Sequence, residues 1–322
     1  MEENSVKKNE DVEKLKYITY QIHKTFGKKY ENYCITRIYH LLNQDDIHFI
    51  TQQYFKRKDG TIGLADLYLP QINMSIEINE EYHEKQVEAD CLRRNDQNIY
   101  NKEITDKLKN LGDVIYFELE IKTIEITKET TLQNINKQID DILSEIRRKI
   151  KELKENGKFS EWTSICKTPQ KYIKDNNYTI SIAQNVRLRT IFDVSELFNK
   201  GYKGCQICFF PTRKNSKEEY VWCPQLKILK DDCQNNPFDN EISEDGQYLY
   251  EKSKKENDKD SYTKDRKERR IVFAKYKNET GTFMYKYIGI FKYNKKESFE
   301  KQVAAWKKEE TDKIDLKPYF NS

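Results

Sequence analysis

The sequence has little apolar character. Hydrophobic residues make up 36% of its 322 residues, mean hydropathy is −0.97, and no run approaches the roughly 18 apolar residues that a membrane-spanning helix needs. The N-terminal stretch MEENSVKKNEDVEKL has no apolar segment of the kind that a signal peptide requires. Seven cysteines are too few, and odd in number, for a disulfide framework. We therefore expect a cytoplasmic protein with reduced thiols and no membrane association.

Histidine is also scarce, and glycine-rich phosphate-binding loops are absent from the sequence. The four histidines, His23, His40, His48 and His83, all lie in the first 83 residues. The second half of the chain therefore cannot contain a histidine-dependent metal site or catalytic triad. No phosphate-binding loop of the GxxxxGK or GxGxxG type is present. The net charge of +4 permits nucleic-acid binding but does not argue for it, because the local field decides such binding.

Length and aromatic content predict two folded domains. Aromatic residues make up 12% of the chain, which is enough large apolar surface for two cores. At roughly 100–200 residues per domain, this length corresponds to about two of them. Hydrophobic periodicity in the first half predicts helices, then three strands, a helix and a strand. The helices are expected at 11–26, 30–43 and about 85–111, and the strands at 48–55, 62–70, 73–79 and 113–119.

A long helix is expected to close the first half, and strands to dominate the second. Isoleucine and leucine recur at helical spacing over 132–155. Two long polar loops are expected at 227–244 and 252–269, and loops of this length are usually functional or mobile. The fold class is therefore α+β in two domains. The strands of the second half are expected at 178–184, 186–190, 205–211, 219–224, 270–276 and 283–293.

Two acidic residues on neighbouring predicted strands form the candidate catalytic centre. Asp66 and Glu77 lie eleven positions apart, and Asn79 follows on the same strand face as Glu77. Two such carboxylates can bind one Mg²⁺, which prefers oxygen ligands and leaves other positions to water and phosphate. The backbone carbonyl of Ile78 could add a third ligand. Each acid alone is more often a solvated surface residue, so the signal comes from their combination.

The same pattern resembles the PD-(D/E)xK nuclease superfamily, in which an acidic residue is followed after a spacer by (D/E)xK. The sequence departs from that motif, because Ala65 replaces the proline and Asn79 replaces the lysine. Asparagine cannot carry a positive charge, so the acid–base role falls to another group. His83 is the candidate, since histidine titrates near neutral pH. A histidine soon after this strand is similar to the Vsr mismatch-repair nuclease variant of the fold.

Longer strings resemble the AbaSI-like Type IV restriction endonucleases, which cut DNA carrying 5-hydroxymethylcytosine or its glucosylated form. The resemblance implies a Vsr-like PD-(D/E)xK nuclease domain over residues 1–157, with a mixed sheet flanked by helices. It also implies an SRA-like domain with a curved sheet over residues 158–322. The strings that carry it are KKYENYCITRIYHLLN (28–43), FITQQYF (49–55), LADLYLPQINMSIEINEEYH (64–83), RIVFAKY (270–276) and MYKYIGIF (284–291).

The resemblance also implies site residues in both domains. The nuclease site would contain Asp66, Glu77, Glu80 and His83, together with Asn79 where the family tends to have aspartate. Other residues within the matched strings that could complete it are Glu31, Gln52 and Gln53. A modified-base pocket would contain Trp222, Phe238, Asp239, Asn240 and Glu251. An ordinary core tryptophan and plain turn residues remain the alternatives for Trp222 and for the Asp239–Asn240 pair.

The expected function is a Mg²⁺-dependent endonuclease, in which Mn²⁺ can substitute, acting on double-stranded DNA that contains modified cytosine. It would flip the base, cut at a fixed distance from it as a homodimer, and defend a cell against phage with modified DNA. The alternatives are a modified-cytosine-binding module without activity and a Vsr-like nicking repair enzyme. A zinc site at Cys205 and Cys208 is disfavoured, because Cys223 and Cys233 do not have the spacing of a second CxxC pair.

Overall fold

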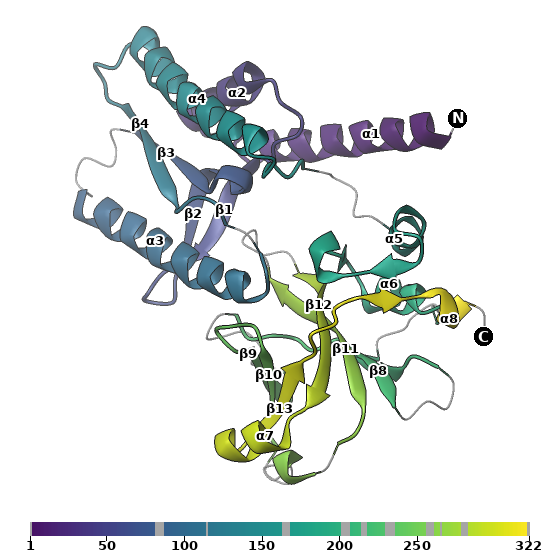
Figure 1. Ribbon diagram of the computed structural model, residues 1–322. Helices are drawn as coiled ribbons and strands as arrows, with labels where there is room; N and C mark the ends of the chain where they lie inside the picture. The colour runs from purple at the N-terminus through teal and green to yellow at the C-terminus, as the bar shows by residue number, and fades with distance from the viewer. Residues whose placement is uncertain are drawn as a thin grey trace. The chain divides into compact units, whose positions relative to one another are not determined.

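The chain divides into two compact units. The first contains residues 1–103 and 115–165, and the second contains residues 104–114 and 166–322. The C-terminal end of one helix of the first half, with the residues after it, therefore belongs to the second unit. The computed structural model describes residues 2–80, 87–113, 115–162, 168–200, 207–213, 218–228, 236–255, 261–264, 266–277 and 283–320 (Figure 1).

The first unit is built on a four-stranded mixed sheet in the order β1-β2-β3-β4. Strands β1, β2 and β3 are antiparallel neighbours, and β4 runs parallel to β3. This arrangement confirms the predicted mixed sheet flanked by helices. Its elements are α1 (Glu2–His23), α2 (Lys29–Leu42), β1 (Ile50–Lys56), β2 (Ile62–Leu69), η1 (Pro70–Ile72), β3 (Met74–Glu80), α3 (Val87–Asn110), β4 (Glu120–Ile126) and α4 (Leu132–Glu155).

The two faces of this sheet differ in chemistry. Helices α2 and α4 lie on one side and α3 on the other (Figure 1). Because side chains alternate along a strand, Ile76 and Ile78 of β3 enter the apolar core with α2 and α4. Ser75 and Glu77 alternate with them and meet polar side chains of α3. The α3 side of the sheet is therefore buried but polar.

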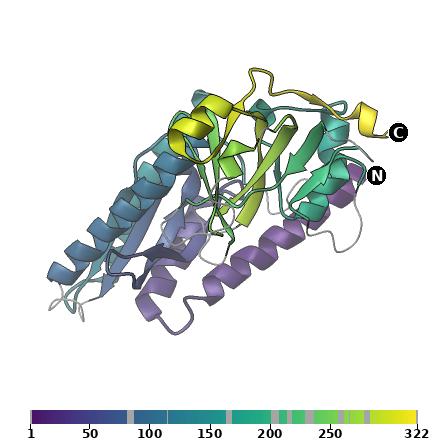
Figure 2. The ribbon, with the colours of Figure 1, turned by 90° about the horizontal axis from the view of Figure 1, so that it is seen from below.

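The long N-terminal helix adds to the apolar side only near its end. Figure 2 shows α1 as one continuous helix that a short turn connects to α2. Ile18 belongs to the buried core, and Tyr17 and Ile22 pack against it. No helix among the described residues is long and apolar enough to cross a membrane.

The predicted strand over 113–119 is wrong. The strand that pairs with β3 is β4, which begins at Glu120. The run DVIYFEL has the residue types of a strand, but Asp113 is instead buried in an ion-pair network of the second unit. Tyr116 is 40% exposed. Tertiary contacts have overridden local propensity here.

The second unit is built on a large antiparallel-rich sheet in the order β7-β8-β11-β12-β13-β10-β9, with β6 pairing to β12. This confirms the strand-rich second domain. Its elements are α5 (Pro169–Asp175), β5 (Thr179–Ile180), η3 (Ile182–Gln184), β6 (Arg187–Leu188), α6 (Ile191–Leu197), β7 (Phe209–Pro211), β8 (Glu219–Trp222), β9 (Phe238–Ile242), β10 (Tyr248–Ser253), η5 (Ser261–Thr263), β11 (Arg269–Lys277), β12 (Phe283–Tyr293), α7 (Lys295–Lys301), β13 (Ala304–Lys308), β14 (Ile314–Asp315) and α8 (Lys317–Phe320).

One face of this sheet carries the core of the second unit. Side chains of β8, β11 and β12 such as Val221, Phe273 and Tyr287 pack with residues of α5, α6 and α8. The predicted loop over 227–244 is wrong in part, because it contains β9. Strands β10 and β13 were not predicted either. The opposite face of the sheet displays Trp222 and Trp306 outside that core, with ring centroids 6.0 Å apart.

Candidate functional site

Strand pairing brings the two predicted catalytic carboxylates together. Leu67 of β2 pairs with Ile76 of β3, so the next positions, Asp66 and Glu77, lie opposite each other. Directly opposed side chains on antiparallel strands share a face, with their Cβ atoms about 4.5–5.5 Å apart. Asp66 is 8% exposed and Glu77 is 1% exposed. The two carboxylates are therefore close neighbours in a buried setting.

The side chain of Asp66 accepts a backbone hydrogen bond from β3 at the point where the β2–β3 pairing ends. Its Oδ2 accepts a hydrogen bond from the backbone N–H of Ile78 at 2.8 Å. The paired residues of β2 and β3 end just before this point, at Leu67 and Ile76. Among the residues that the structure describes, the other oxygen, Oδ1, has one long contact, of 3.4 Å from Nε2 of Gln52. One oxygen of Asp66 is thus fixed by the backbone and the other is weakly bound.

Glu77 is held from the α3 side. Arg93 of α3 donates to its Oε2 at 2.8 Å. Ser75, which receives a hydrogen bond from Gln97, makes a 3.5 Å contact with Oε1. Burial raises the pKa of Glu77 to about 8, with the charge of Asp66 also raising it and that of Arg93 lowering it. Glu77, like Asp66, has one firmly bound oxygen and one weakly bound oxygen.

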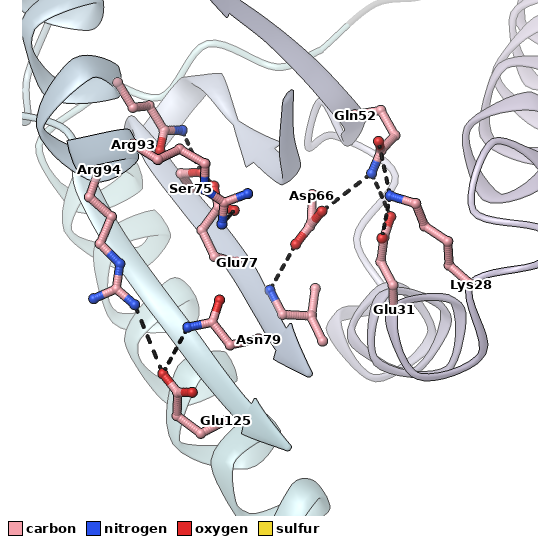
Figure 3. Close-up of polar contacts among 12 residues, drawn as sticks. Lys28, Glu31, Gln52, Asp66, Ser75, Glu77, Asn79, Arg93, Arg94 and Glu125 are labelled. Carbon is pink, nitrogen blue, oxygen red and sulfur yellow. Dashed lines mark hydrogen bonds and ion pairs between the residues drawn. The ribbon is translucent and has the colours of Figure 1, made fainter. Parts of the chain in front are cut away.

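A second buried glutamate lies on the other side of Asp66 (Figure 3). Glu31 of α2 accepts hydrogen bonds from Gln52 at 2.5 Å and forms an ion pair with Lys28 at 2.7 Å. Burial raises the pKa of Glu31 to about 7, and the nearby charge of Asp66 raises it further against the effect of Lys28. Gln52 therefore connects Glu31 to Asp66.

A local backbone feature of β1 places Gln52 in that position. The β1–β2 register puts Gln52 opposite Asp66, but the pair is interrupted there and resumes at Gln53 and Ala65. Gln52 has a φ of 51°, in the left-handed region that non-glycine residues seldom adopt. Strained backbone of this kind often accompanies functional sites.

Of the remaining predicted nuclease residues, Asn79, Gln53 and Glu80 do not join the Asp66–Glu77 pair. Asn79 donates to Glu125 of β4 at 3.1 Å. Gln53 donates to the carbonyl of Tyr54 at 3.0 Å. Glu80 is half-buried at the end of β3 and lies near Cys34 of α2, whose pKa is raised by burial and further by the charge of Glu80. His83 lies outside the described residues.

The donor set suits magnesium. Within the described ranges, which leave out 81–86, no group of three or more His, Cys, Asp or Glu side chains is placed to hold a metal ion. Mg²⁺ commonly takes only one or two protein carboxylates and keeps several water ligands. Asp66 and Glu77 each have one weakly bound oxygen, and they sit opposite each other. These residues therefore fit a two-carboxylate magnesium site.

In the second unit, strand pairing brings Asn240 and Glu251 together. The two residues are direct partners in the β9–β10 register and so share a face. Nδ2 of Asn240 donates to the carbonyl of Gln225 at 3.1 Å. Its Oδ1 is buried and has no hydrogen-bond partner in the described part of the chain. An unpaired buried acceptor costs free energy and points to a ligand or water.

Glu251 lies in an aromatic and cationic cluster. Its Oε2 accepts hydrogen bonds from Arg266 at 3.1 Å, Arg270 at 3.1 Å and Nε1 of Trp306 at 3.3 Å. The guanidinium carbon of Arg270 lies 3.4 Å from the ring centroid of Trp306 and 4.6 Å from that of Trp222. Trp222 thus belongs to this cluster and not to the main core of its unit.

The other predicted pocket residues are less central. Phe238 pairs with Ser253 two positions from Asn240 and so lies on the same face, half-buried. Asp239 alternates to the opposite face and forms an ion pair with Lys254 at 3.2 Å. Of the four cysteines considered for a zinc site, Cys205 and Cys233 lie outside the described residues.

Comparisons with known proteins agree with this architecture. Residues 15–147 match the family "Restriction endonuclease PvuRts1 I-like, N-terminal", and residues 172–314 match the "SET and RING associated domain" (SRA). The structure "The 5-Hydroxymethylcytosine-Specific Restriction Enzyme AbaSI" is similar, with a TM-score of 0.55 and 28% identity over 94% of this chain and 97% of that one. This chain is an AbaSI-like restriction endonuclease. No curated protein matches it.

Both the AbaSI-like resemblance and the two-domain α+β fold predicted from the sequence are confirmed. Sequence reasoning did not find three residues of this AbaSI-like chain that contact the candidate sites: Arg93, Arg270 and Trp306. Arg93 lies on the strongly polar helix α3, and the sequence does not distinguish it from the many other charged residues of that helix. Arg270 and Trp306 lie on strands, and only strand pairing shows that they meet Glu251. The one sequence signal for Trp306 was the scarcity of tryptophan, of which the chain has three.

Proposed function

We propose that the chain is a Mg²⁺-dependent endonuclease that recognises 5-hydroxymethylcytosine, free or glucosylated, in duplex DNA and cuts at a fixed distance from it. The observation that carries the proposal is the pair of opposed carboxylates, Asp66 and Glu77, in a PvuRts1I-like unit. A second unit of the SRA family carries two acceptor groups, Asn240 and Glu251, beside two tryptophans. The similarity to AbaSI, whose title names 5-hydroxymethylcytosine, supports the choice of base.

In the nuclease site, Asp66 and Glu77 would hold the Mg²⁺, with the carbonyl of Ile78 as a further ligand. When bound, the ion supplies polarisation of the phosphate, an activated water and stabilisation of the leaving oxygen. Arg93, at 2.8 Å from Glu77, provides the positive charge that Asn79 does not. Mn²⁺ has similar ligand preferences and can substitute.

Proton transfer has two candidate groups. The pKa of Glu31 is raised to about 7, so this carboxyl can gain or lose a proton near neutral pH. Its hydrogen bond from Gln52 fixes its position relative to Asp66. His83, which follows β3 in sequence, remains the second candidate. Glu80 and Asn79 would support the site from the same strand.

In the reading unit, the base would be flipped out of the helix into the cluster around Glu251. Extrusion of a base costs a few kcal/mol, which stacking and hydrogen bonds offset. Trp222, Trp306 and Phe238 provide aromatic surface. The exocyclic amino group of cytosine is a donor, and Asn240 and Glu251 supply acceptors for it. This match favours a cytosine derivative.

The cutting of both strands implies a homodimer, because one nuclease site hydrolyses one strand. An enzyme of this specificity would act as a Type IV restriction enzyme in the cytoplasm, against phage whose DNA carries modified cytosine. Its substrate is double-stranded DNA, and it needs no membrane.

The test compares Asp66→Asn and Glu77→Gln with Asp141→Asn, a matched control on the exposed face of α4. In Mg²⁺, the two site variants should cut hydroxymethylated DNA about 10³-fold more slowly, equivalent to about 4 kcal/mol of barrier. The control should cut like the parent. All four proteins should bind hydroxymethylated DNA equally in EDTA. Cleavage that is unchanged in the site variants would contradict the assignment.

The same assay separates the alternatives. A parent protein that binds hydroxymethylated DNA but cuts none in Mg²⁺ or Mn²⁺ would be a reading module without activity. A parent that nicks a plasmid carrying one mismatch, and does not linearise hydroxymethylated DNA, would be a Vsr-like repair enzyme.

A further inference from the structure

The two acceptor groups of the reading unit are each fixed by a partner. The amide of Asn240 is oriented by the bond from its Nδ2 to the carbonyl of Gln225, so Oδ1 must face the other way. Asn240 is 4% exposed, and this oxygen is buried without a hydrogen-bond partner in the described residues. An acceptor oriented in this way fits a donor group of a ligand.

Glu251 is fixed more strongly, and through one oxygen only. Arg270, Arg266 and Trp306 all donate to its Oε2, at 3.1, 3.1 and 3.3 Å. No described residue donates to Oε1. A carboxylate accepts hydrogen bonds through both of its oxygens. Glu251 therefore offers a second acceptor on the same face as Asn240.

Arg270 is the most constrained of these donors. Its side chain is 6% exposed, compared with 19% for that of Arg266. Its second amino group donates to Glu268 at 3.1 Å, and its guanidinium lies over the ring of Trp306 at 3.4 Å from the centroid. Held in this way at both terminal nitrogens, Nη1 and Nη2, and on one face of the guanidinium, Arg270 has little freedom to release Glu251.

We infer that Arg270 is a positioning residue that holds the acceptor of Glu251 toward the base and so makes the pocket select cytosine-type over uracil-type modified bases. This inference rests on the proposed function and names its specificity determinant. Cytosine presents an amino donor at position 4, where uracil presents a carbonyl acceptor. If the base presents a carbonyl to the two acceptors, its oxygen and both acceptor oxygens are left without a hydrogen bond. An amino group instead donates hydrogen bonds to the acceptors. Without Arg270, the Glu251 side chain loses its most constrained donor and is no longer held with its free oxygen toward position 4 of the base.

The experiment measures binding of the full chain in EDTA to matched duplexes with one 5-hydroxymethylcytosine, one 5-hydroxymethyluracil or one unmodified cytosine. The readout is the ratio of the dissociation constants for the uracil and cytosine forms. The parent should favour hydroxymethylcytosine by about tenfold or more. Arg270→Met, which keeps apolar volume but removes the charge, should bring this ratio to within about threefold.

Arg269→Met is the matched control. Arg269 is the neighbouring residue on β11, and it also forms ion pairs with two glutamates, Glu219 and Glu309, but not with Glu251. Its substitution should leave the ratio at the parent value. Glu251→Gln should lower the ratio, because an amide can donate as well as accept. Adding Arg270→Met to Glu251→Gln should then change the ratio no further, since Arg270 acts through Glu251.

Arg266→Met keeps the inference testable if Arg270→Met does not fold, as judged by its thermal unfolding. It removes the more exposed guanidinium from the same oxygen and should shift the ratio in the same direction by a smaller factor. An Arg270→Met protein that keeps the parent ratio would overturn the inference, as would tighter binding to both bases with the ratio intact. A parent that does not distinguish hydroxymethylcytosine from unmodified cytosine would instead overturn the proposed function.

Discussion

Replacing Glu77 by glutamine should remove activity and stabilise the metal-free fold at the same time. Burial raises the pKa of Glu77 to about 8 from its ordinary value of 4.5. A carboxyl whose pKa is raised on folding favours the protonated form, so its contribution to stability is complete below pH 4.5 and is lost as the pH rises to about 8. Glutamine does not titrate and can still accept a hydrogen bond from Arg93.

The size of the effect follows from the two pKa values. The difference between 4.5 and about 8 corresponds to at most about 5 kcal/mol of unfolding free energy. Cleavage should fall about 10³-fold in the same variant, because a metal ligand is lost. Substitution of a carboxylate that is unfavourably buried in a catalytic site is expected to raise stability and abolish function together.

The assay is calorimetric unfolding in EDTA between pH 5 and 8.5, with Glu129→Gln as the exposed control. The stability of the parent and of the control should fall relative to Glu77→Gln as the pH rises. Adding Mg²⁺ at pH 8 should stabilise the parent by mass action and the variant much less. Equal stability of the parent and Glu77→Gln at pH 8 in EDTA, or equal stabilisation of both by Mg²⁺, would refute the reasoning.

Two further predictions concern buried charges away from the sites. Asp113→Ala should destabilise the second unit by about 3–5 kcal/mol, because it leaves Lys286, 1% exposed, without its carboxylate. In a double-mutant cycle, adding Lys286→Met should recover most of the lost stability. Strictly additive effects of the two substitutions would contradict this prediction. Burial lowers the pKa of His48 to about 4, so its contribution to stability is present above pH 6.5 and lost as the pH falls toward 4, by about 3 kcal/mol. His48→Gln, which retains an acceptor for Tyr17, should lack this loss in acid unfolding titrations, and an unchanged acid limb would count against the assignment.

Local sequence signals were sufficient where a segment carries its own pattern. The isoleucine and leucine seam over 132–155 predicts the bounds of α4, and the dense apolar run over 283–293 predicts those of β12. Asp66 and Glu77 were placed on neighbouring strands because each lies in a short strand-like run, the first ending at Pro70 and the second short and alternating in sequence. In these cases the hydrophobic period alone determines the element.

Elements that depend on distant partners could not be predicted. Strands β9, β10 and β13 are short and mixed in composition, and they form through pairing in the sheet: β9 pairs with β10, and β13 joins β10 to β12. The strand predicted at 113–119 failed for the converse reason, since Asp113 has stronger partners elsewhere. The contacts of Arg93 and Arg270 likewise exist only in the folded chain.

Digestion of one duplex, prepared with cytosine, 5-methylcytosine, 5-hydroxymethylcytosine or glucosylated 5-hydroxymethylcytosine, tests the central claim most directly. In Mg²⁺, the parent protein should cut one or both hydroxymethylated forms at a fixed distance from the modified base, leave unmodified DNA intact and cut nothing in EDTA. Equal digestion of all four duplexes, or digestion of none while the protein binds them without preference, would contradict the account.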